Sequence, residues 1–161
     1  MKKMILSFCL IFLSICSMAQ TWTGEENCDW NNPGNWSCWP LDNKQLTIDP
    51  ANLCGECALP EIVNASVFIP SLITIQNGAT LFIKNNLTVQ EDINIFDQGT
   101  QVQFDEGSLK ILADKGRLII ADGSALIMHN GLLSLYSPLV VEEGGKFVQS
   151  GGTVNLKHST Q

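Results

Sequence analysis

Three acidic side chains at regularly spaced turns are the residues of this sequence best placed to do chemistry. Asp97, Asp122 and Glu143 each precede a turn glycine by one or two positions and recur at nearly equal intervals. If these turns stack, Asp97 and Asp122 lie about 5 Å apart, which suits a retaining pair of glycosidase carboxylates or a shared calcium ion. Tight corners also favour aspartate because its side chain stabilises turns. We therefore predict no catalytic residue and treat these three as candidate calcium or glycan contacts.

The four cysteines beyond the N-terminal stretch are a second group that could do chemistry. Cys54 and Cys57 have the C-x2-C spacing of half a zinc site, but Cys28 and Cys38 do not form a second such pair. An even number of cysteines in an exported chain predicts two disulfides instead, for which three pairings exist. We favour Cys28–Cys38 with Cys54–Cys57 because both loops are short. No metal or other cofactor is expected.

Neither histidine has a sequence context that suggests nucleophilic catalysis. His129 stands at a predicted corner and His158 in the tail, and neither has a serine or cysteine partner that suggests a catalytic triad. The serines of this region lack the G-x-S-x-G motif that exposes a nucleophile at a sharp turn. Both histidines are therefore expected to be surface residues.

A repeat that begins near Val67 must position these side chains. Short segments alternate apolar and polar side chains, which is the pattern of a β-strand, and glycine-bearing turns separate them. The turn glycines recur at a nearly constant interval, at Gly78, Gly99, Gly123 and Gly144. The apolar residues fall into three sets with nearly the same spacing: Leu81, Val102, Leu126 and Phe147; Leu87, Leu109, Leu133 and Val154; and Ile73, Ile93, Leu118 and Leu139.

Three short strands in each repeat, at a period of roughly 20 to 25 residues, describe one coil of a three-sided parallel β-helix. Stacked coils bury their inward side chains in continuous ladders, which a single coil cannot do. An antiparallel sandwich would not require a constant offset at every third strand, and a leucine-rich repeat would need a helical segment and a fixed Asn or Cys. We predict an all-β solenoid of about four to six coils, with an irregular first coil.

The N-terminal stretch 1–19 has the pattern of a secretory signal peptide. Two lysines precede an apolar run that is too short to span a membrane, and small residues precede a cleavage point after Ala19. A lipoprotein would use Cys16, but an isoleucine stands before it where a small residue is expected. We predict a signal peptide at 1–19, an N-terminal cap at 20–60, the β-helix at 61–157 and a tail at 158–161.

The charge of the exported part argues against two classes of partner. Without Lys2 and Lys3, 7 basic residues remain against 16 acidic ones, a net charge of about −9. Such a chain repels nucleic acid and anionic membranes. No second apolar run is long enough to span a bilayer. We expect a secreted or cell-surface protein that binds no nucleic acid and does not insert into a membrane.

The segment 20–60 differs in composition from the repeats. It holds the four cysteines and all four tryptophans, and proline and asparagine are frequent in it. The first coil of a solenoid exposes apolar side chains and strand edges, so a cap is required. The tryptophans share no strand spacing, which favours a buried cap over an aromatic platform for carbohydrate. We find no such cap after the last strand, at 154–156, and expect a partner, fraying or end-to-end self-association there. The tryptophans are Trp22, Trp30, Trp36 and Trp39.

These segments resemble a known class of proteins. Residues 21–24 (TWTG), 34–37 (GNWS) and Pro40 are similar to the opening of secreted bacterial adhesin-like β-helix proteins, and 73–81 (ITIQNGATL) is similar to their repeats. The resemblance implies a right-handed β-helix and export, often by the type IX route. Such proteins usually end in a sorting domain, which we do not find after Leu156. The family has no shared catalytic residues.

Two classes of function follow from these features. The first is a non-catalytic secreted or cell-surface module for adhesion or structure, whose rigid β-helix surface contacts glycans or other surface proteins. The alternative is a carbohydrate-active or carbohydrate-binding β-helix that uses the acidic corner residues. We favour the first class, because the chain is small for such an enzyme and shows no long loops that would wall a cleft.

Overall fold

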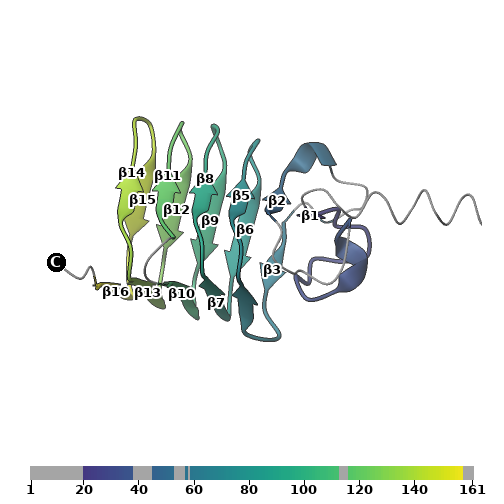
Figure 1. Cartoon of the computed structure of the whole chain (residues 1–161), viewed down its shortest axis with the longest axis horizontal. Helices are drawn as coiled ribbons and strands as arrows, with labels where there is room; N and C mark the ends of the chain where they lie inside the picture. Colours follow the sequence, from purple (N-terminus) through teal and green to yellow (C-terminus); the bar gives the residue numbers. More distant parts are fainter. Residues whose placement is uncertain (1–19, 38–44, 53–56, 58, 113–115, 158–161) are drawn as a thin grey trace, which may run out of the picture.

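The protein is an all-β solenoid built from three parallel sheets (Figure 1). The computed structural model describes residues 20–37, 45–52, 57, 59–112 and 116–157. Within these residues the helical segments are two short 3-10 turns, η2 (Pro33–Asn35) and η3 (Pro50–Asn52). No helix in this part of the chain is long and apolar enough to cross a membrane.

Each sheet takes one strand from every coil. The first sheet contains β1 (Gln20–Thr21), β2 (Leu46–Ile48), β5 (Ile73–Ile75), β8 (Ile93–Ile95), β11 (Leu118–Ile120) and β14 (Leu139–Val141). The second sheet contains β3 (Glu61–Ile62), β6 (Thr80–Ile83), β9 (Gln101–Phe104), β12 (Ala125–Met128) and β15 (Lys146–Gln149). The third sheet contains β4 (Val67–Ile69), β7 (Asn86–Val89), β10 (Ser108–Ile111), β13 (Leu132–Leu135) and β16 (Thr153–Leu156).

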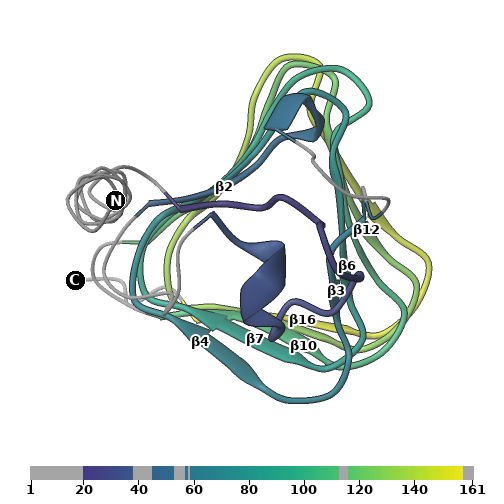
Figure 2. The ribbon, with the colours of Figure 1, turned by 90° about the vertical axis from the view of Figure 1, so that its right-hand side faces the viewer.

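The chain visits the three sheets in turn, so β5, β6 and β7 make one coil and β8 returns to lie beside β5. Viewed from the N-terminal end in Figure 2, the sheets enclose a triangular cross-section and the chain runs clockwise as it recedes. The solenoid is therefore right-handed, as parallel crossover connections almost always are. Four complete coils, from β5 to β16, follow an irregular first coil of β2, β3 and β4.

The observed register is the one that the repeat spacing predicts. Leu81 pairs with Val102, Val102 with Leu126, and Leu126 with Phe147, all in parallel. The other two predicted ladders, in the first and third sheets, have the same coil-to-coil pairing. A shift of one residue would turn the inward side chains of a strand to solvent, so the apolar alternation fixes this register.

The interior of the solenoid is filled by aliphatic side chains, together with the inward side chains of Phe104 and Met128. Every inward residue of the coils from β5 to β13 is at most 2% exposed. Complete burial of such a side chain contributes about 1.5 to 3 kcal/mol. The continuous ladders are therefore the main stabilising feature, and the outer faces and corners remain available for function.

The N-terminal segment closes one end of the solenoid (Figures 1 and 2). β1 pairs with β2, and Asp29 forms a parallel bridge with Glu61 at the start of β3. The Trp36 ring packs against Trp30 and Trp22, with ring centroids 4.7 and 5.2 Å away. These contacts confirm the predicted tryptophan-rich cap. β2 falls within the segment 20–60, yet it is a strand of the solenoid.

Candidate functional site

The acidic residues predicted from the sequence lie at one corner of the solenoid, on successive coils. Asp97, Asp122 and Glu143 each follow the last residue of a first-sheet strand by two positions, as Asn77 does one coil earlier. Asn77, Asp97 and Asp122 have φ angles of 57°, 72° and 52°. Asparagine and aspartate tolerate this left-handed conformation better than most residues. The corner geometry by itself therefore accounts for their residue types.

Hydrogen bonds from the preceding coil occupy part of this corner. The Asp97 carboxylate accepts a hydrogen bond from the backbone N–H of Asn77 at 3.2 Å, and the Thr100 hydroxyl accepts one from Gly78 at 2.9 Å. In the described part of the chain, no three Asp, Glu, His or Cys side chains gather closely enough to hold a metal ion. The three predicted residues share a corner without forming a common ligand set. Their contact with a glycan stays a prediction.

Asp49 is a buried carboxylate at the first coil that the sequence analysis missed. Its Oδ2 atom accepts hydrogen bonds from the side chains of Gln76 at 2.7 Å and Asn77 at 2.9 Å, and Oδ1 accepts one from the Ala51 backbone at 2.8 Å. Burial raises the pKa of Asp49, but the three hydrogen bonds outweigh it and hold the pKa below its ordinary value of 3.8. The charged carboxylate therefore joins the first two coils.

The tryptophans of the cap are not accessible to a ligand. Trp22 and Trp30 are fully buried, and Trp36 is 5% exposed. The indole N–H of Trp22 donates to the carbonyl of Cys57 at 3.1 Å, and that of Trp36 donates to the carbonyl of Trp30 at 2.9 Å. These three rings are core of the cap and not a carbohydrate platform. Trp39 lies outside the described residues.

Asn35 organises the loop around the tryptophans. Its side chain is fully buried and uses both of its polar atoms twice. The Oδ1 atom accepts hydrogen bonds from the backbone N–H groups of Glu26 at 2.9 Å and Asn27 at 3.0 Å. The Nδ2 atom donates to the Asn27 side chain at 2.8 Å and to the Asp29 carbonyl at 2.9 Å. Asn35 thus satisfies its full hydrogen-bonding capacity within the cap.

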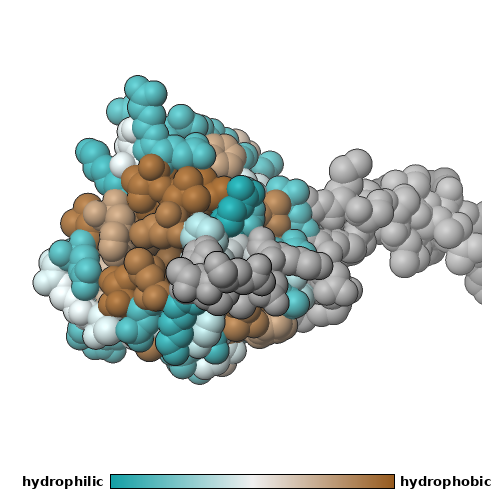
Figure 3. Space-filling view, turned by 60° about the vertical axis from the view of Figure 1, so that its left-hand side comes forward, coloured by the Kyte–Doolittle hydropathy of each residue, from teal (hydrophilic) through white to brown (hydrophobic). Residues whose placement is uncertain are grey.

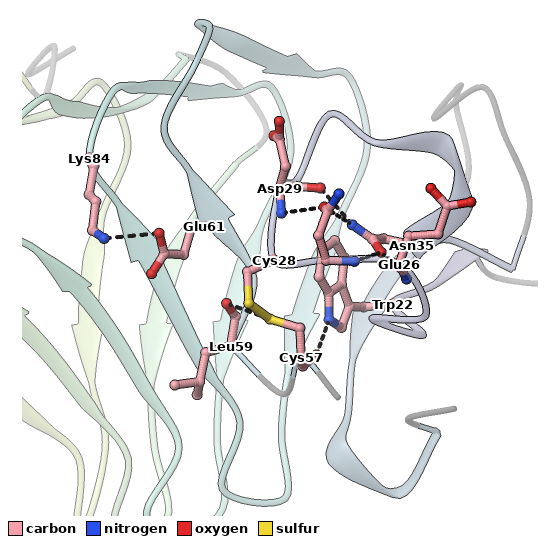
Figure 4. The surroundings of a disulfide bond; sticks show 10 residues. Trp22, Glu26, Cys28, Asp29, Asn35, Cys57, Leu59, Glu61 and Lys84 are labelled. Carbon is pink, nitrogen blue, oxygen red and sulfur yellow. Dashed lines mark hydrogen bonds and ion pairs between the residues drawn. A yellow bond between two sulfur atoms is a disulfide. The ribbon is translucent and has the colours of Figure 1, made fainter. Parts of the chain in front are cut away.

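The disulfide in the cap differs from the predicted pairing (Figure 4). Cys28 is bonded to Cys57, with Cα atoms 5.3 Å apart and a sequence separation of 29. The predicted pairing of Cys28 with Cys38 and of Cys54 with Cys57 is therefore wrong. Cys38 and Cys54 lie outside the described residues.

The backbone of the cap explains why Cys28 meets Cys57. The Cys28 carbonyl accepts a hydrogen bond from the N–H of Glu61 at 2.8 Å, so this segment runs beside the start of β3. The N–H of Cys57 donates to the carbonyl of Gly24 at 3.4 Å. Gly24 has a φ of 59°, and a Cβ atom there would collide with the Cys57 carbonyl oxygen. The two distant cysteines are therefore held together by long-range backbone contacts that short loops do not predict.

Asp105, His129 and Ser150 form a row across three coils, so His129 has a serine neighbour that the sequence analysis did not identify. The His129 Nδ1 atom lies 3.1 Å from the Ser150 hydroxyl, and Nε2 lies 4.0 Å from Asp105 Oδ1. The second distance is too long for the hydrogen bond that orients the histidine of a catalytic triad. The side chains of His129 and Asp105 are each 54% exposed, so they leave the row open to water. We interpret this row as a contact between coils. His158 lies outside the described residues.

Other charged side chains also connect neighbouring coils. Lys84 Nζ lies 2.9 Å from Glu61 Oε2, and Arg117 Nη2 lies 2.8 Å from Asp92 Oδ2. The hydrogen bond with Asp92 raises the pKa of Arg117 above its ordinary value. Exposed ion pairs of this kind contribute only about 0.2 to 1 kcal/mol each. Their main effect is to fix side-chain positions on the outer surface.

The outer face of the third sheet carries a row of hydroxyl and amide groups that runs from coil to coil. The Asn86 amide donates to the Ser66 hydroxyl at 3.1 Å and accepts from the Ser108 hydroxyl at 2.8 Å. Phe68 projects from β4 at the cap end of this face and is 55% exposed. Polar groups in a row beside an exposed aromatic ring can hydrogen-bond the hydroxyls of a sugar and stack on its apolar side.

Tyr136 marks the far side of the same sheet. It follows β13, and the ammonium groups of Lys110 and Lys157 lie 5.4 and 5.2 Å from its ring centroid. The Lys157 ammonium also donates to the Tyr136 hydroxyl at 3.3 Å. Contacts of this type hold the ring in place across three coils. Ser108 pairs with Leu132, so Tyr136 lies four residues along the strand from the polar row, at the opposite end of the strands of this sheet.

Comparisons with known proteins add no functional evidence. No protein-family model, no curated protein and no solved structure matches this chain.

Proposed function

We propose that this protein is a non-catalytic secreted or cell-surface module that acts in adhesion or structure, and that it binds glycans through the outer face of the third sheet. The observation that carries this proposal is the polar row of Ser66, Asn86 and Ser108 beside the exposed ring of Phe68. Each amide and hydroxyl in the row retains hydrogen-bonding capacity beyond its contact within the row.

Two further features support a non-catalytic role outside the cell: a disulfide, which fits the location, and contacts between coils, which fit a rigid binding surface. The Cys28–Cys57 disulfide is of a kind that persists in oxidising compartments. The side chains that could act in catalysis are engaged in contacts between coils instead, as Asp97 is with Asn77 and His129 is with Ser150. Such contacts suit a rigid surface that presents fixed groups, and a rigid surface loses little conformational freedom when it binds.

A glycan array probed with the purified full chain tests this proposal. We expect binding that Phe68→Ala reduces at least tenfold, because the substitution removes the exposed stacking surface. Phe82→Ala is the matched control: Phe82 points outward from β6 in the neighbouring sheet, so its loss should leave binding unchanged. Equal effects of the two substitutions, or no binding to any glycan, would refute the assignment of this face.

The same preparation distinguishes binding from catalysis. A non-catalytic module leaves every polysaccharide of a test panel uncleaved. Cleavage that is lost in an Asp97→Asn, Asp122→Asn double variant with unchanged thermal stability would show that the acidic corner is an active site. That outcome would replace the proposal with the carbohydrate-active alternative.

A further inference from the structure

The last coil forms an apolar face at the C-terminal end of the solenoid (Figure 3). Its inward positions continue the three ladders, but Val141 and Leu156 are 46% and 63% exposed, whereas their counterparts in the preceding coils are buried. In Figure 3 the apolar surface gathers in the middle of this end and polar residues surround it. The inward residues of this coil are Leu139, Val141, Phe147, Gln149, Val154 and Leu156.

The same coil presents three strand edges. In β15, the N–H groups of Lys146 and Ser150 donate back to Ser124 and Met128 of the preceding coil. Because successive residues of a strand alternate in direction, Phe147 directs its N–H and C=O groups away from that coil. Within the described residues, no strand pairs with the outer edges of β14, β15 and β16. Unpaired edges of this kind are templates for another chain.

We propose that a second copy of this chain covers the face, with the two last coils packed against each other around a two-fold axis. The two-fold rotation inverts one solenoid, so every edge strand meets a strand of the other copy in the antiparallel direction. An axis through the corner between β14 and β15 sets β14 against β15 of the second copy, and β16 against its own equivalent. All three edges then gain backbone hydrogen bonds.

Charge favours this axis over a neighbouring one. When Val141 lies opposite Phe147 of the second copy, the antiparallel register places Glu142 opposite Lys146 of that copy, twice by symmetry. An axis through the corner between β15 and β16 would instead oppose Lys146 and Lys157. The last coil is also neutral as a whole, so two copies meet without net repulsion, although the chain is acidic. Its charged residues are Glu142, Glu143, Lys146 and Lys157.

The assembly stops at two copies because the cap occupies two of the three strand edges at the other end of the solenoid, those of β2 and β3. β1 already pairs with β2, and Asp29 occupies the edge of β3 through its bridge to Glu61. The buried rings of the cap cover the first coil. A head-to-tail stack of copies would have to displace these contacts. The two-fold pair leaves both caps at its outer ends.

The size of the face sets the expected affinity. One coil runs from Leu118 to its stacked partner Leu139. At about 3.3 Å per residue the contour of such a coil is roughly 70 Å, which encloses at most about 400 Å². Stable interfaces bury about 800 Å² on each partner, so the side chains alone support only weak association. With the added hydrogen bonds of the three edges, we expect dissociation in the micromolar range.

Charge exchange tests the arrangement by sedimentation equilibrium of the full chain across micromolar concentrations. We expect a reversible dimer for the parent chain, and at least tenfold weaker association for Lys146→Glu and for Glu142→Lys alone. Mixing the two variants should restore the dimer, because each Glu142–Lys146 contact then regains opposite charges. The matched control is Glu106→Lys, an exposed charge change two coils away that should leave the dimer intact.

Restoration on mixing also excludes misfolding as the cause of the losses, since unfolded variants would not recover one another. The charge of Glu142 also favours the charged form of Arg117 in the preceding coil, so we expect Glu142→Lys to lose some stability for this separate reason. A monomer at every concentration, an assembly larger than two, or a dimer that both variants retain would overturn the proposal. This association does not depend on whether the third sheet binds a glycan.

Discussion

Removal of the Cys28–Cys57 disulfide should destabilise the protein by an amount that follows from the length of the loop it closes. The bond joins cysteines with a sequence separation of 29. The loss of chain entropy for a loop of that size corresponds to about 3.6 kcal/mol at 25 °C. A local bond between Cys28 and Cys38 would close a loop of about 10 residues, for which the same relation gives about 2.7 kcal/mol.

Unfolding in guanidinium chloride measures this contribution. We expect Cys28→Ser, Cys57→Ser and the double variant to lose the same free energy of unfolding, because each of them removes the same bond. Losses that add in the double variant would contradict the pairing.

Peptide mapping without reduction shows independently which cysteine is bonded to Cys57. Cleavage after Lys44 and after Glu56 places Cys28, Cys54 and Cys57 on three separate peptides. The peptide that begins with Cys57 should therefore remain linked to the peptide that contains Cys28. Recovery of Cys57 linked to the Cys54 peptide would refute the pairing and with it the contact between the cap and the start of β3.

Four substitutions test the rest of the structural argument. Asn35→Ala should cost about 2 to 4 kcal/mol in chemical denaturation, because it leaves the N–H groups of Glu26 and Asn27 without their acceptor. Phe104→Ala should cost about 3 to 5 kcal/mol in the same assay, since it empties a buried ladder position, while the exposed control Phe68→Ala should stay within about 0.5 kcal/mol. Gly24→Ala should lower the melting temperature, because the left-handed φ alone costs about 1 to 2 kcal/mol and the added Cβ meets the Cys57 carbonyl. The pKa of Asp49 is lower in the folded state, so its charged form stabilises the protein above about pH 3.8, and that stabilisation is lost as the pH falls through the folded-state pKa. Thermal melts across the acidic range should therefore show a shallower loss of stability for Asp49→Asn than for the parent chain.

The architecture of the solenoid could be predicted because one physical rule, the stacking of inward side chains, governs every coil. Leu81, Val102 and Leu126 are alike in type and evenly spaced, so their pairing follows from the sequence. The row of Asp105, His129 and Ser150 obeys the same rule, since its members also recur at the interval of one coil.

The cap could not be predicted to the same depth. Its position followed from composition, but four cysteines allow three pairings, and spacing alone does not choose among them. The pairing depends on backbone hydrogen bonds between Gly24 and Cys57 and between Cys28 and Glu61, which no repeat encodes. Asp49 escaped notice for a related reason, since it belongs to the irregular first coil and has no equivalent at the regular interval.

Equivalent strands of successive coils pair in one common register, and this has a consequence for how the length of such a solenoid can change. Each coil touches only the coils before and after it, and all of them share one register. Duplication or loss of a segment between two equivalent corners would therefore keep every ladder in phase, whereas a shorter insertion within a strand would not. The distance between the cap and the opposite face can therefore change in steps of about 4.8 Å, one step for each coil that a gene duplication adds or a deletion removes.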